Sequence, residues 1–179
     1  TMHMLSWLST EGTAAIVEFP GVLYCGGAEG KIRDYLVRNN FVDAVIQLPA
    51  DLFFGTTIAT CVLVLKRSKA TSDILFVDAS TEFQRADAKN KLKPANIDRI
   101  ALTVINRVEE ENFSVLVSND DVLANDANLS VSSYVEKPDD REEIDIDALN
   151  AEIARIVARE QELRDAIDEI IADLEGGAR

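Results

Sequence analysis

Two apolar runs separated by a short connection constrain the fold more than any other feature of the sequence. Phe41–Leu48 and Ile58–Leu65 are both nearly continuous apolar segments of strand length. The nine residues between them, Pro49–Thr57, contain no helical periodicity. A parallel crossover needs about a dozen residues or more, so the second strand is expected to run antiparallel to the first.

A strand and a helix precede this pair. Thr13–Phe19 is an apolar run that Pro20-Gly21 ends, and it is predicted to be a strand buried on both faces. Ala28–Arg38 follows with a helical pattern whose apolar face carries Ile32, Tyr35 and Leu36. Strand, helix and strand predict two parallel strands joined by a right-handed crossover. The predicted fold class is therefore α/β, with a sheet that ends in one antiparallel strand and the Pro49–Thr57 connection at its edge.

The middle of the chain predicts a strand, a loop, a helix and a further strand. Ile74–Val77 and Phe113–Val117 are short apolar runs, and the polar, basic residues 79–95 are expected to be an exposed loop. Asn96 is placed to cap the helix. The helix is expected to run from Ile97 to about Val108, with an apolar face made of Ile97, Ile100, Ala101, Val104 and Ile105.

Two polar segments come before residue 138. Ser118, with Asp121 three residues later, resembles a capping box at the start of a helix. Asn125–Val135 is rich in Asn and Ser and is expected to be an ordered loop.

After Pro138 the pattern becomes that of a long helix. Apolar side chains recur at alternating steps of four and three residues, with one polar member: Leu149, Ile153, Ile156, Glu160, Leu163, Ile167, Ile170 and Leu174. This spacing is typical of a coiled-coil seam. We therefore predict a domain over residues 1–138 and a helical tail over 139–179. Within the tail, residues 146–174 would form one helix that packs against its own domain, a second copy or another protein.

Charge is distributed unevenly along the chain. Residues 139–179 hold five basic and fourteen acidic side chains, a net −9, which leaves −5 of the total −14 for the first 138 residues. The first domain therefore neither requires nor forbids a DNA surface, whereas the tail is expected not to lie along DNA. No secretory signal or membrane-spanning stretch is present. With two cysteines, Cys25 and Cys61, expected to be buried and reduced, a cytoplasmic protein without a membrane partner is predicted.

The connection between the second and third strands has an unusual composition. Phe53 and Phe54 are adjacent, and Gly55, Thr56 and Thr57 follow them. One interpretation is that both rings pack under the sheet. The other is an aromatic platform for a planar ligand, since a nucleobase stacked on Phe gains about 1–3 kcal/mol.

Two other candidate sites are weak. Gly26-Gly27 opens a helix, but it lacks both the P-loop and the dinucleotide glycine spacing, and Glu29 would repel an anion. His3 is the single histidine and lies near the start of the sequence, so no histidine-based or metal chemistry is predicted.

Several segments, taken together and in order, resemble a known family. They are Gly12–Pro20, Glu29–Leu36, Val45–Pro49, Phe53–Thr60, Leu75–Ala79 and Asn125–Val135. They look like the C-terminal half of the modification (M) subunit of type I restriction-modification systems. That family comprises S-adenosylmethionine-dependent DNA methyltransferases that modify adenine N6. The resemblance implies a partial Rossmann-like class I methyltransferase sheet over residues 1–138, followed by a coiled-coil-type helical tail for subunit association.

The resemblance also shows which family motifs this sequence lacks. The family binds its cofactor at a Gly-rich turn after the first strand and holds the target amino group with an Asn-Pro-Pro-Phe/Tyr tetrad, and neither is present. The chain is therefore expected to be a fragment, from cloning or from a split or truncated gene. No catalytic, cofactor-binding or metal residue is expected in it. S-adenosylmethionine would bind the complete enzyme and not this fragment.

The remaining implications concern contacts. By resemblance, Phe53 would stack on the flipped target adenine, with Phe54 as second choice. Thr56, Thr57 and Lys31 lie near enough in the sequence to be expected to touch DNA phosphate. The expected partners are DNA, the specificity (S) subunit and the restriction (R) subunit, with self-association through residues 146–174 as a further option.

Two functions stay open at this point. The chain is either part of a DNA adenine methyltransferase or a non-catalytic protein–protein interaction module from a truncated or split gene. Methylating subunits of type IIG and phage-defence systems share the core motifs, so the resemblance does not distinguish them from a type I subunit.

Overall fold

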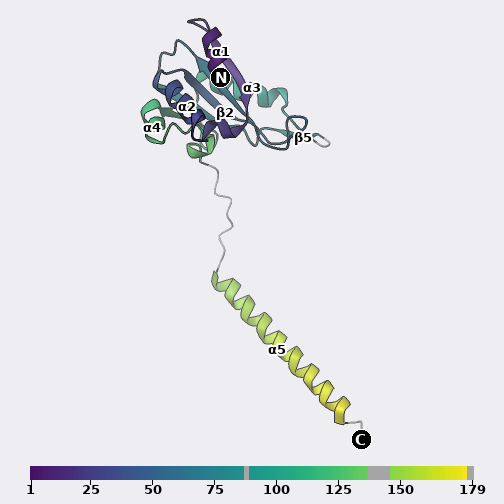
Figure 1. Ribbon diagram of the computed structural model, residues 1–179. Helices are drawn as coiled ribbons and strands as arrows, with labels where there is room; N and C mark the ends of the chain where they lie inside the picture. The colour runs from purple at the N-terminus through teal and green to yellow at the C-terminus, as the bar shows by residue number, and fades with distance from the viewer. Residues whose placement is uncertain (87–88, 137–145, 177–179) are drawn as a thin grey trace. The chain divides into compact units, whose positions relative to one another are not determined.

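The computed structural model describes residues 1–86, 89–136 and 146–176 (Figure 1). The chain divides into two compact units, Thr1–Pro138 and Asp139–Arg179. The first unit holds a five-stranded sheet with helices, and the described residues of the second form one helix, α5, over Ile146–Gly176.

The sheet is mixed and has the strand order β1-β3-β2-β4-β7. Its strands are β1 (Thr13–Glu18), β2 (Val42–Gln47), β3 (Cys61–Lys66), β4 (Asp73–Asp78) and β7 (Ser114–Ser118). β3 runs antiparallel to both β1 and β2, β4 runs parallel to β2, and β7 runs antiparallel to β4. The predicted α/β class and the antiparallel direction of β3 are confirmed.

The predicted position of the reversed strand is wrong. β3 lies between β1 and β2 and does not end the sheet. The helix that joins β1 to β2 leaves a gap between these parallel strands, and β3 returns from β2 as a hairpin to fill it. The sheet then continues on the other side of β2 with β4 and β7, so the β2–β3 connection is not at an edge.

β1 is an edge strand, and the prediction that both its faces are buried is wrong. Its side chains alternate between exposed and half-buried, and Val17 is 50% exposed. The Ile16 side chain packs on the core, whereas Val17 points to a face that no described helix covers at this edge. β2, in contrast, is buried on both faces because it is the central strand.

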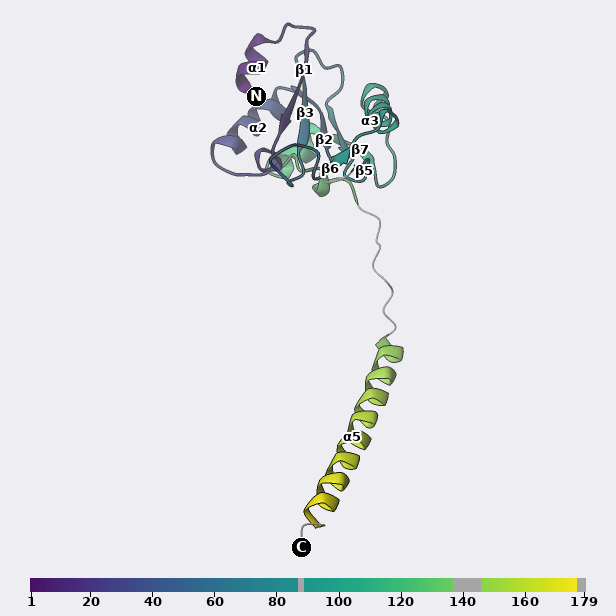
Figure 2. The same cartoon turned by 90° about the vertical axis from the view of Figure 1, so that its right-hand side faces the viewer.

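Helices cover both faces of the sheet (Figure 2). One face packs against α1 (Met2–Trp7), α2 (Ala28–Arg38), α4 (Asn119–Ala124) and the short 3-10 turns Pro20–Leu23 and Val131–Ser133, through buried residues that include Leu5, Leu36, Phe76, Val122 and Leu129. The other face packs against α3 (Pro94–Asn106) through Ile46, Val64, Leu75, Val77 and Ile100. The result is a three-layer α/β/α unit.

The faces of the two longer helices differ in part from those predicted. α2 has the predicted bounds, but Tyr35 is exposed. Arg33 is buried instead, because the Arg33 guanidinium donates hydrogen bonds to the backbone oxygens of Val22, Cys25 and Ala127.

α3 begins at Pro94, which needs no backbone hydrogen-bond partner at a first-turn position. Asn96 is therefore not the N-cap; its side chain accepts a hydrogen bond from the backbone N–H of Lys93. α3 buries Ile100 and Thr103, whereas Ile97, Ala101 and Ile105 are exposed.

The prediction that residues 79–95 form an exposed loop is wrong in part. They contain a hairpin of β5 (Gln84–Ala86) and β6 (Lys89–Lys91), in which Gln84 pairs with Lys91. The strands are too short and too polar to give an apolar pattern, so the sequence did not predict them.

Other local predictions had mixed outcomes. The Ser118 hydroxyl accepts from the backbone N–H of Asp121, as predicted for a capping residue. Cys61 is buried, and burial raises the pKa of its thiol to about 11. Cys25 is exposed, because it follows a 3-10 turn outside the sheet and not a buried strand.

The tail forms one continuous helix over its described residues. The seam side chains of α5 that are described, among them Ile153, Ile156 and Ile170, are half to three-fifths exposed. A partner for this seam stays a prediction, and residues 139–145 of the predicted tail lie outside the described residues. None of the described helices combines the length and apolarity that crossing a lipid bilayer requires.

Candidate nucleic-acid interface

The loop between β2 and β3 stands on a rigid base. The backbone N–H of Leu48 donates to the carbonyl of Thr60 at 2.8 Å, and the Gln47 side-chain amide donates to the same carbonyl at 3.3 Å. Leu48 and Pro49 are buried, so the loop leaves directly from the core. The Thr60 hydroxyl is buried at this base, with no hydrogen-bond partner among the described residues.

The aromatic rings of the loop lie at the surface. Phe54 is 96% exposed and Phe53 is 42% exposed, whereas Leu52 packs against the core. Exposure of both rings excludes the interpretation that they pack under the sheet. A large apolar side chain left in water costs about 1.5–3 kcal/mol relative to a buried one, so this loop presents surface suited to binding.

The residues after the rings shape the tip of the loop. Gly55 has φ +79°, a left-handed conformation that glycine adopts without strain. The Thr56 hydroxyl accepts from the backbone N–H of Ile58 at 3.0 Å, which closes a local turn. Thr57 and Ile58 are exposed beside it, so an aromatic pair, a hydroxyl and an aliphatic side chain share one surface.

The β5–β6 hairpin is locked to this loop by hydrogen bonds and ion pairs. The Lys89 ammonium lies 3.1 Å from the Asp51 carboxylate and donates to the Thr56 carbonyl at 2.9 Å. The Arg85 guanidinium lies 3.2 Å from the same carboxylate. The Asn90 backbone N–H donates to the Asp51 carbonyl at 3.0 Å, and its side chain donates to the Ala50 carbonyl at 2.9 Å.

Asp51 is the centre of this junction. Its hydrogen bonds from Lys89 and then Arg85 hold the pKa of its carboxyl below the usual value. Its backbone has φ 60°, which directs the loop toward the hairpin. Sequence reasoning missed Asp51, Arg85 and Lys89, and the signal was the excess of basic residues in 79–95.

The predicted site residues are brought together only in part. Phe53, Phe54, Thr56 and Thr57 share one loop. Lys31 lies in the first turn of α2, at the same end of the sheet, since β1 and β2 both end there. Among the described residues, no hydrogen bond or ion pair links Lys31 to the loop.

The opposite end of the sheet carries a second charge cluster. The Asp43 carboxylate, only 3% exposed, lies 2.9 Å from the Lys66 ammonium and 2.9 Å from the Arg107 guanidinium. Arg107 also lies 2.7 Å from the Asp73 carboxylate. Burial, and next the neighbouring Arg107, lowers the pKa of Lys69 to about 8. These groups join the ends of β2, β3, β4 and α3 and have a structural role.

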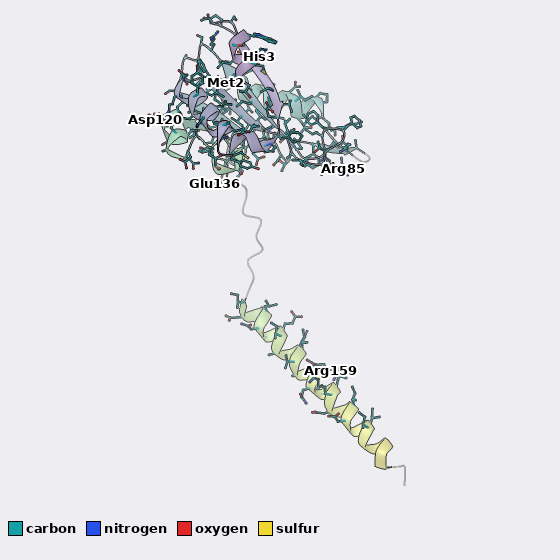
Figure 3. The ribbon with its side chains drawn as sticks, in the orientation of Figure 1. Met2, His3, Arg85, Asp120, Glu136 and Arg159 are labelled. Carbon is teal, nitrogen blue, oxygen red and sulfur yellow. The ribbon has the colours of Figure 1, made fainter. Side chains whose placement is uncertain are left out.

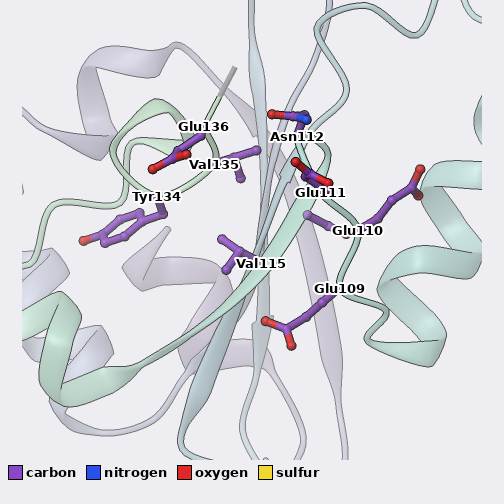
Figure 4. A pocket seen from close by; sticks show the side chains of 9 residues that line it. Glu109, Glu110, Glu111, Asn112, Val115, Tyr134, Val135 and Glu136 are labelled. Carbon is purple, nitrogen blue, oxygen red and sulfur yellow. The ribbon is translucent and has the colours of Figure 1, made fainter. Parts of the chain in front are cut away.

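A third region is a hollow of about 330 Å³ lined by Glu109, Glu110, Glu111, Glu136 and Tyr134 (Figure 4). Its carboxylates would repel phosphate, and two of them already have partners. Glu110 pairs with Arg99 at 2.6 Å, and Glu109 accepts from the backbone N–H of Leu116 at 3.0 Å. Neither here nor elsewhere in the described residues are three or more His, Cys, Asp or Glu side chains grouped so that they could hold a metal ion. The β2–β3 loop is therefore the better candidate for nucleic acid.

Relatives of this chain are methylase subunits of type I restriction enzymes. The MpnII methylase subunit of Mycoplasma pneumoniae is 47% identical over 174 residues, which cover 97% of this chain and 32% of that protein. The MjaVII methylase subunit of Methanocaldococcus jannaschii is 35% identical over 167 residues, which cover 90% of this chain and 28% of that protein. The chain thus spans about a third of the length of these relatives.

Solved structures give the same result. A type I restriction-modification methyltransferase subunit from Streptococcus thermophilus matches with a TM-score of 0.73 and 38% identity, covering 75% of this chain and 29% of that one. The EcoKI M protein matches with a TM-score of 0.58 over 94% of this chain and 43% of its own, at 17% identity, which shows similarity of fold alone. A family model described as N-6 DNA Methylase matches residues 1–143. The chain therefore belongs to the N-6 DNA methylase family.

Proposed function

We propose that the chain is part of the M subunit of a type I restriction-modification system, which transfers a methyl group from S-adenosylmethionine to adenine N6 in DNA when complete. The observation that carries this proposal is the exposed aromatic pair of the β2–β3 loop, on a chain that is 47% identical to a type I methylase subunit. A binding role explains why two phenylalanines stay at the surface of a loop anchored in the core.

In this proposal Phe53 stacks on the target adenine after it leaves the duplex. Extruding a base costs a few kcal/mol, and an aromatic face recovers about 1–3 kcal/mol of it. Phe53 is 42% exposed, so part of its side chain is covered by protein while the rest is available. Phe54 is the alternative, and Thr56, Thr57 and Lys31 are proposed to contact phosphate near the base.

The chain alone is proposed to be inactive. No Gly-rich turn follows β1, which leads through Phe19 into the 3-10 turn Pro20–Leu23, and the exposed Glu29 carboxylate follows Gly26-Gly27. The residues present therefore do not fit S-adenosylmethionine, and we assign no step of the reaction to them. β1 has exposed side chains and an open edge, which supports the proposal that further strands pair with it in the complete enzyme. In this proposal those strands carry the missing motifs.

Complementation tests this function. The chain alone should show no saturable binding of S-adenosylmethionine in calorimetric titration. When it is supplied with a polypeptide that carries the Gly-rich turn and the Asn-Pro-Pro-Phe/Tyr tetrad of a type I methylase subunit, and with the S subunit, adenine-N6 methylation of DNA should appear. Micromolar cofactor binding by the chain alone would contradict the fragment proposal, and a complete but inactive assembly would contradict the methylase proposal.

The tail is proposed to associate with other helices. Its half-exposed seam would leave apolar area in water at about 25 cal/mol per Å². The partner is the S subunit or a second copy of this chain, and the R subunit joins the assembled complex. Glu160 lies in the seam and pairs with Arg164 at 2.6 Å, so it can select register or partner.

The exposed seam also favours the second candidate function, a non-catalytic interaction module. Sedimentation of the chain with and without residues 139–179 separates the possibilities. A dimer that this deletion abolishes supports self-association through the seam. A monomer that binds an S subunit only with its tail supports a subunit contact, and a monomer that melts at lower temperature after the deletion shows that α5 packs on its own domain.

A further inference from the structure

We infer that the β5–β6 hairpin and the segment that follows it form a DNA-backbone contact, with Lys91 and Lys93 binding phosphates beside the base that the β2–β3 loop receives. The inference rests on the proposed function and deepens it, because it adds a second binding element to the loop.

Two stretches of the chain concentrate positive charge, this segment and residues 66–69 at the opposite end of the sheet. There Lys66 pairs with Asp43, and Lys69 donates to the Val42 carbonyl. Residues 84–93 contain Arg85, Lys89, Lys91 and Lys93 against one carboxylate, Asp87, a net +3 in a chain of net −14. Arg85 marks the hairpin in Figure 3. Neutralising phosphates with Lys and Arg supplies most of the sequence-independent affinity of proteins for DNA.

The lysines form a row because burial alternates along β6 and beyond it. Asn90 is buried and Leu92 packs against the core, whereas Lys91 and Lys93 are exposed and Lys89 is half-buried. The backbone stays extended at Lys93, with φ −78° and ψ 161°. Side chains two residues apart in an extended segment share a face at a spacing of about 6.6 Å. The inner residues therefore anchor the segment, and the lysines share its outer face.

The cations of the hairpin and of the helix next to it differ in whether a carboxylate already neutralises them. Arg85 and Lys89 share Asp51, and Arg99 on the neighbouring α3 pairs with Glu82 and Glu110. Lys91 and Lys93 have no ion pair or hydrogen bond to their ammonium groups among the described residues. A cation that needs no displaced partner binds phosphate at the lowest cost, so these two lysines are the contact residues.

The paired cations fix the position of the row. Lys89 bonds to both the Asp51 carboxylate and the Thr56 carbonyl, so it holds the hairpin beside the aromatic loop. Asp51, Arg85 and Lys89 are positioning residues, and Phe53, Lys91 and Lys93 are binding residues. A base held by the loop thereby lies beside backbone that the lysines can reach.

Exposed lysines have another known use. On short hairpins they prevent pairing with strands of other molecules. This role predicts no dependence of DNA binding on Lys91 or Lys93, so measurement separates the two roles.

The experiment measures DNA affinity against salt concentration for the assembled methylase that contains this chain. Each phosphate contact contributes about 0.9 to the slope of log K against log salt. The double variant Lys91→Ala/Lys93→Ala should lower the slope by roughly 1.8 and weaken binding about tenfold per lysine near 0.1 M salt. Lys91→Arg/Lys93→Arg keeps both charges and should keep the slope.

The matched control is Arg38→Ala/Arg67→Ala, which removes the same charge from the opposite end of the sheet. Arg38 pairs with Asp34, and Arg67 donates to the Leu8 carbonyl. An unchanged slope in the lysine variant, or an equal loss in the control, overturns the inference. Methylation of target DNA is read in parallel. A lowered slope without methylation in the parent assembly supports the hairpin contact and contradicts the proposed function, and methylation with an unchanged slope does the reverse.

Discussion

Asp43 and Asp51 lie at opposite ends of the sheet, and each binds two cations, but they do so in different surroundings. Asp43 is 3% exposed and binds Lys66 and Arg107, which hold together the ends of the central strands. Asp51 is 24% exposed and binds Arg85 and Lys89, which attach a surface hairpin to a surface loop. The same pairing of charges therefore serves the core at one end and a binding surface at the other.

The difference shows that burial, and not the number of ion pairs, decides what a charge cluster does. Asp43 is the buried member of its cluster, and removing it takes a carboxylate from two cations that are 40% and 23% exposed. At the surface, water replaces the lost partner, and only the relative position of the loop and hairpin changes. Mutations at the two ends should thus separate stability from binding.

The largest effect is expected from Asp43→Asn. Lys66 and Arg107 would lose their shared carboxylate while Arg107 keeps Asp73, and the free energy of unfolding should fall by about 2 kcal/mol. Urea unfolding followed by near-ultraviolet circular dichroism measures the change. A loss below about 1 kcal/mol would mean that the buried end behaves like a surface pair, and the comparison would fail.

Phe53→Ala tests the binding end. In the assembled methylase it should weaken binding to unmodified target DNA by about 1–3 kcal/mol, roughly 5- to 150-fold, while cofactor affinity and the urea midpoint stay unchanged. Phe54→Ala is the matched variant. If only Phe54→Ala weakens binding, the stacking ring is the second phenylalanine and the assignment to Phe53 is wrong.

The pH dependence of stability sharpens the comparison at the buried end. The pKa of Lys69 is lowered to about 8 in the folded state by burial and by Arg107, against an ordinary value of 10.5. The unfolded chain therefore binds more protons above pH 8, and stability should rise as pH increases from about 8 to 9. Above pH 9 the Cys61 thiol, whose pKa is raised to about 11, contributes in the opposite direction.

Lys69→Met is the control for this window. Methionine has a side chain of similar length without the ammonium group, so nothing titrates at this position. The rise in stability between pH 8 and 9 should therefore disappear. A rise of the same size in this variant would assign the effect to another group.

The smallest effect on stability is expected from Asp51→Asn. The urea midpoint should stay the same, because Arg85 and Lys89 can turn to water. Hydrogen exchange at the Asn90 amide should become a few-fold faster, because the hairpin loses its ionic attachment to the loop. A lowered midpoint with unchanged exchange would show that Asp51 acts on stability like Asp43.

Patterns along the chain predicted elements whose packing is uniform, and missed elements whose role depends on distant neighbours. α2 has the bounds expected from its apolar residues, and β2 is one residue shorter at each end than the predicted Phe41–Leu48. The short connection after β2 indicated the direction of β3. The place of β3 between β1 and β2 could not be predicted. The direction of a strand follows from the length of the connection before it, whereas the order of strands depends on how far apart the folded α2 leaves β1 and β2.

The site shows the same division. Two adjacent phenylalanines before Gly55 indicated the loop from composition alone. The hairpin partner stayed hidden because Asp51 meets Lys89 across 38 positions in the chain, through polar contacts that follow no period. Arg33 was missed for the same reason, since it bonds to three carbonyl groups and its burial has no apolar signature.

The placement of β3 also has a consequence for how the chain folds. Within the described part of the chain β1 pairs with β3 alone, with Thr13 opposite Lys66, whereas β2 and β3 are joined by one loop. A hairpin closes in about 1–10 μs, and pairing between distant segments is slower because more chain must be ordered first. During synthesis β1 therefore waits for Lys66 to leave the ribosome, and the β2–β3 hairpin forms before it. The loop that carries Phe53 is then also the turn from which the sheet grows, and insertions there should slow folding before they change any contact with a ligand.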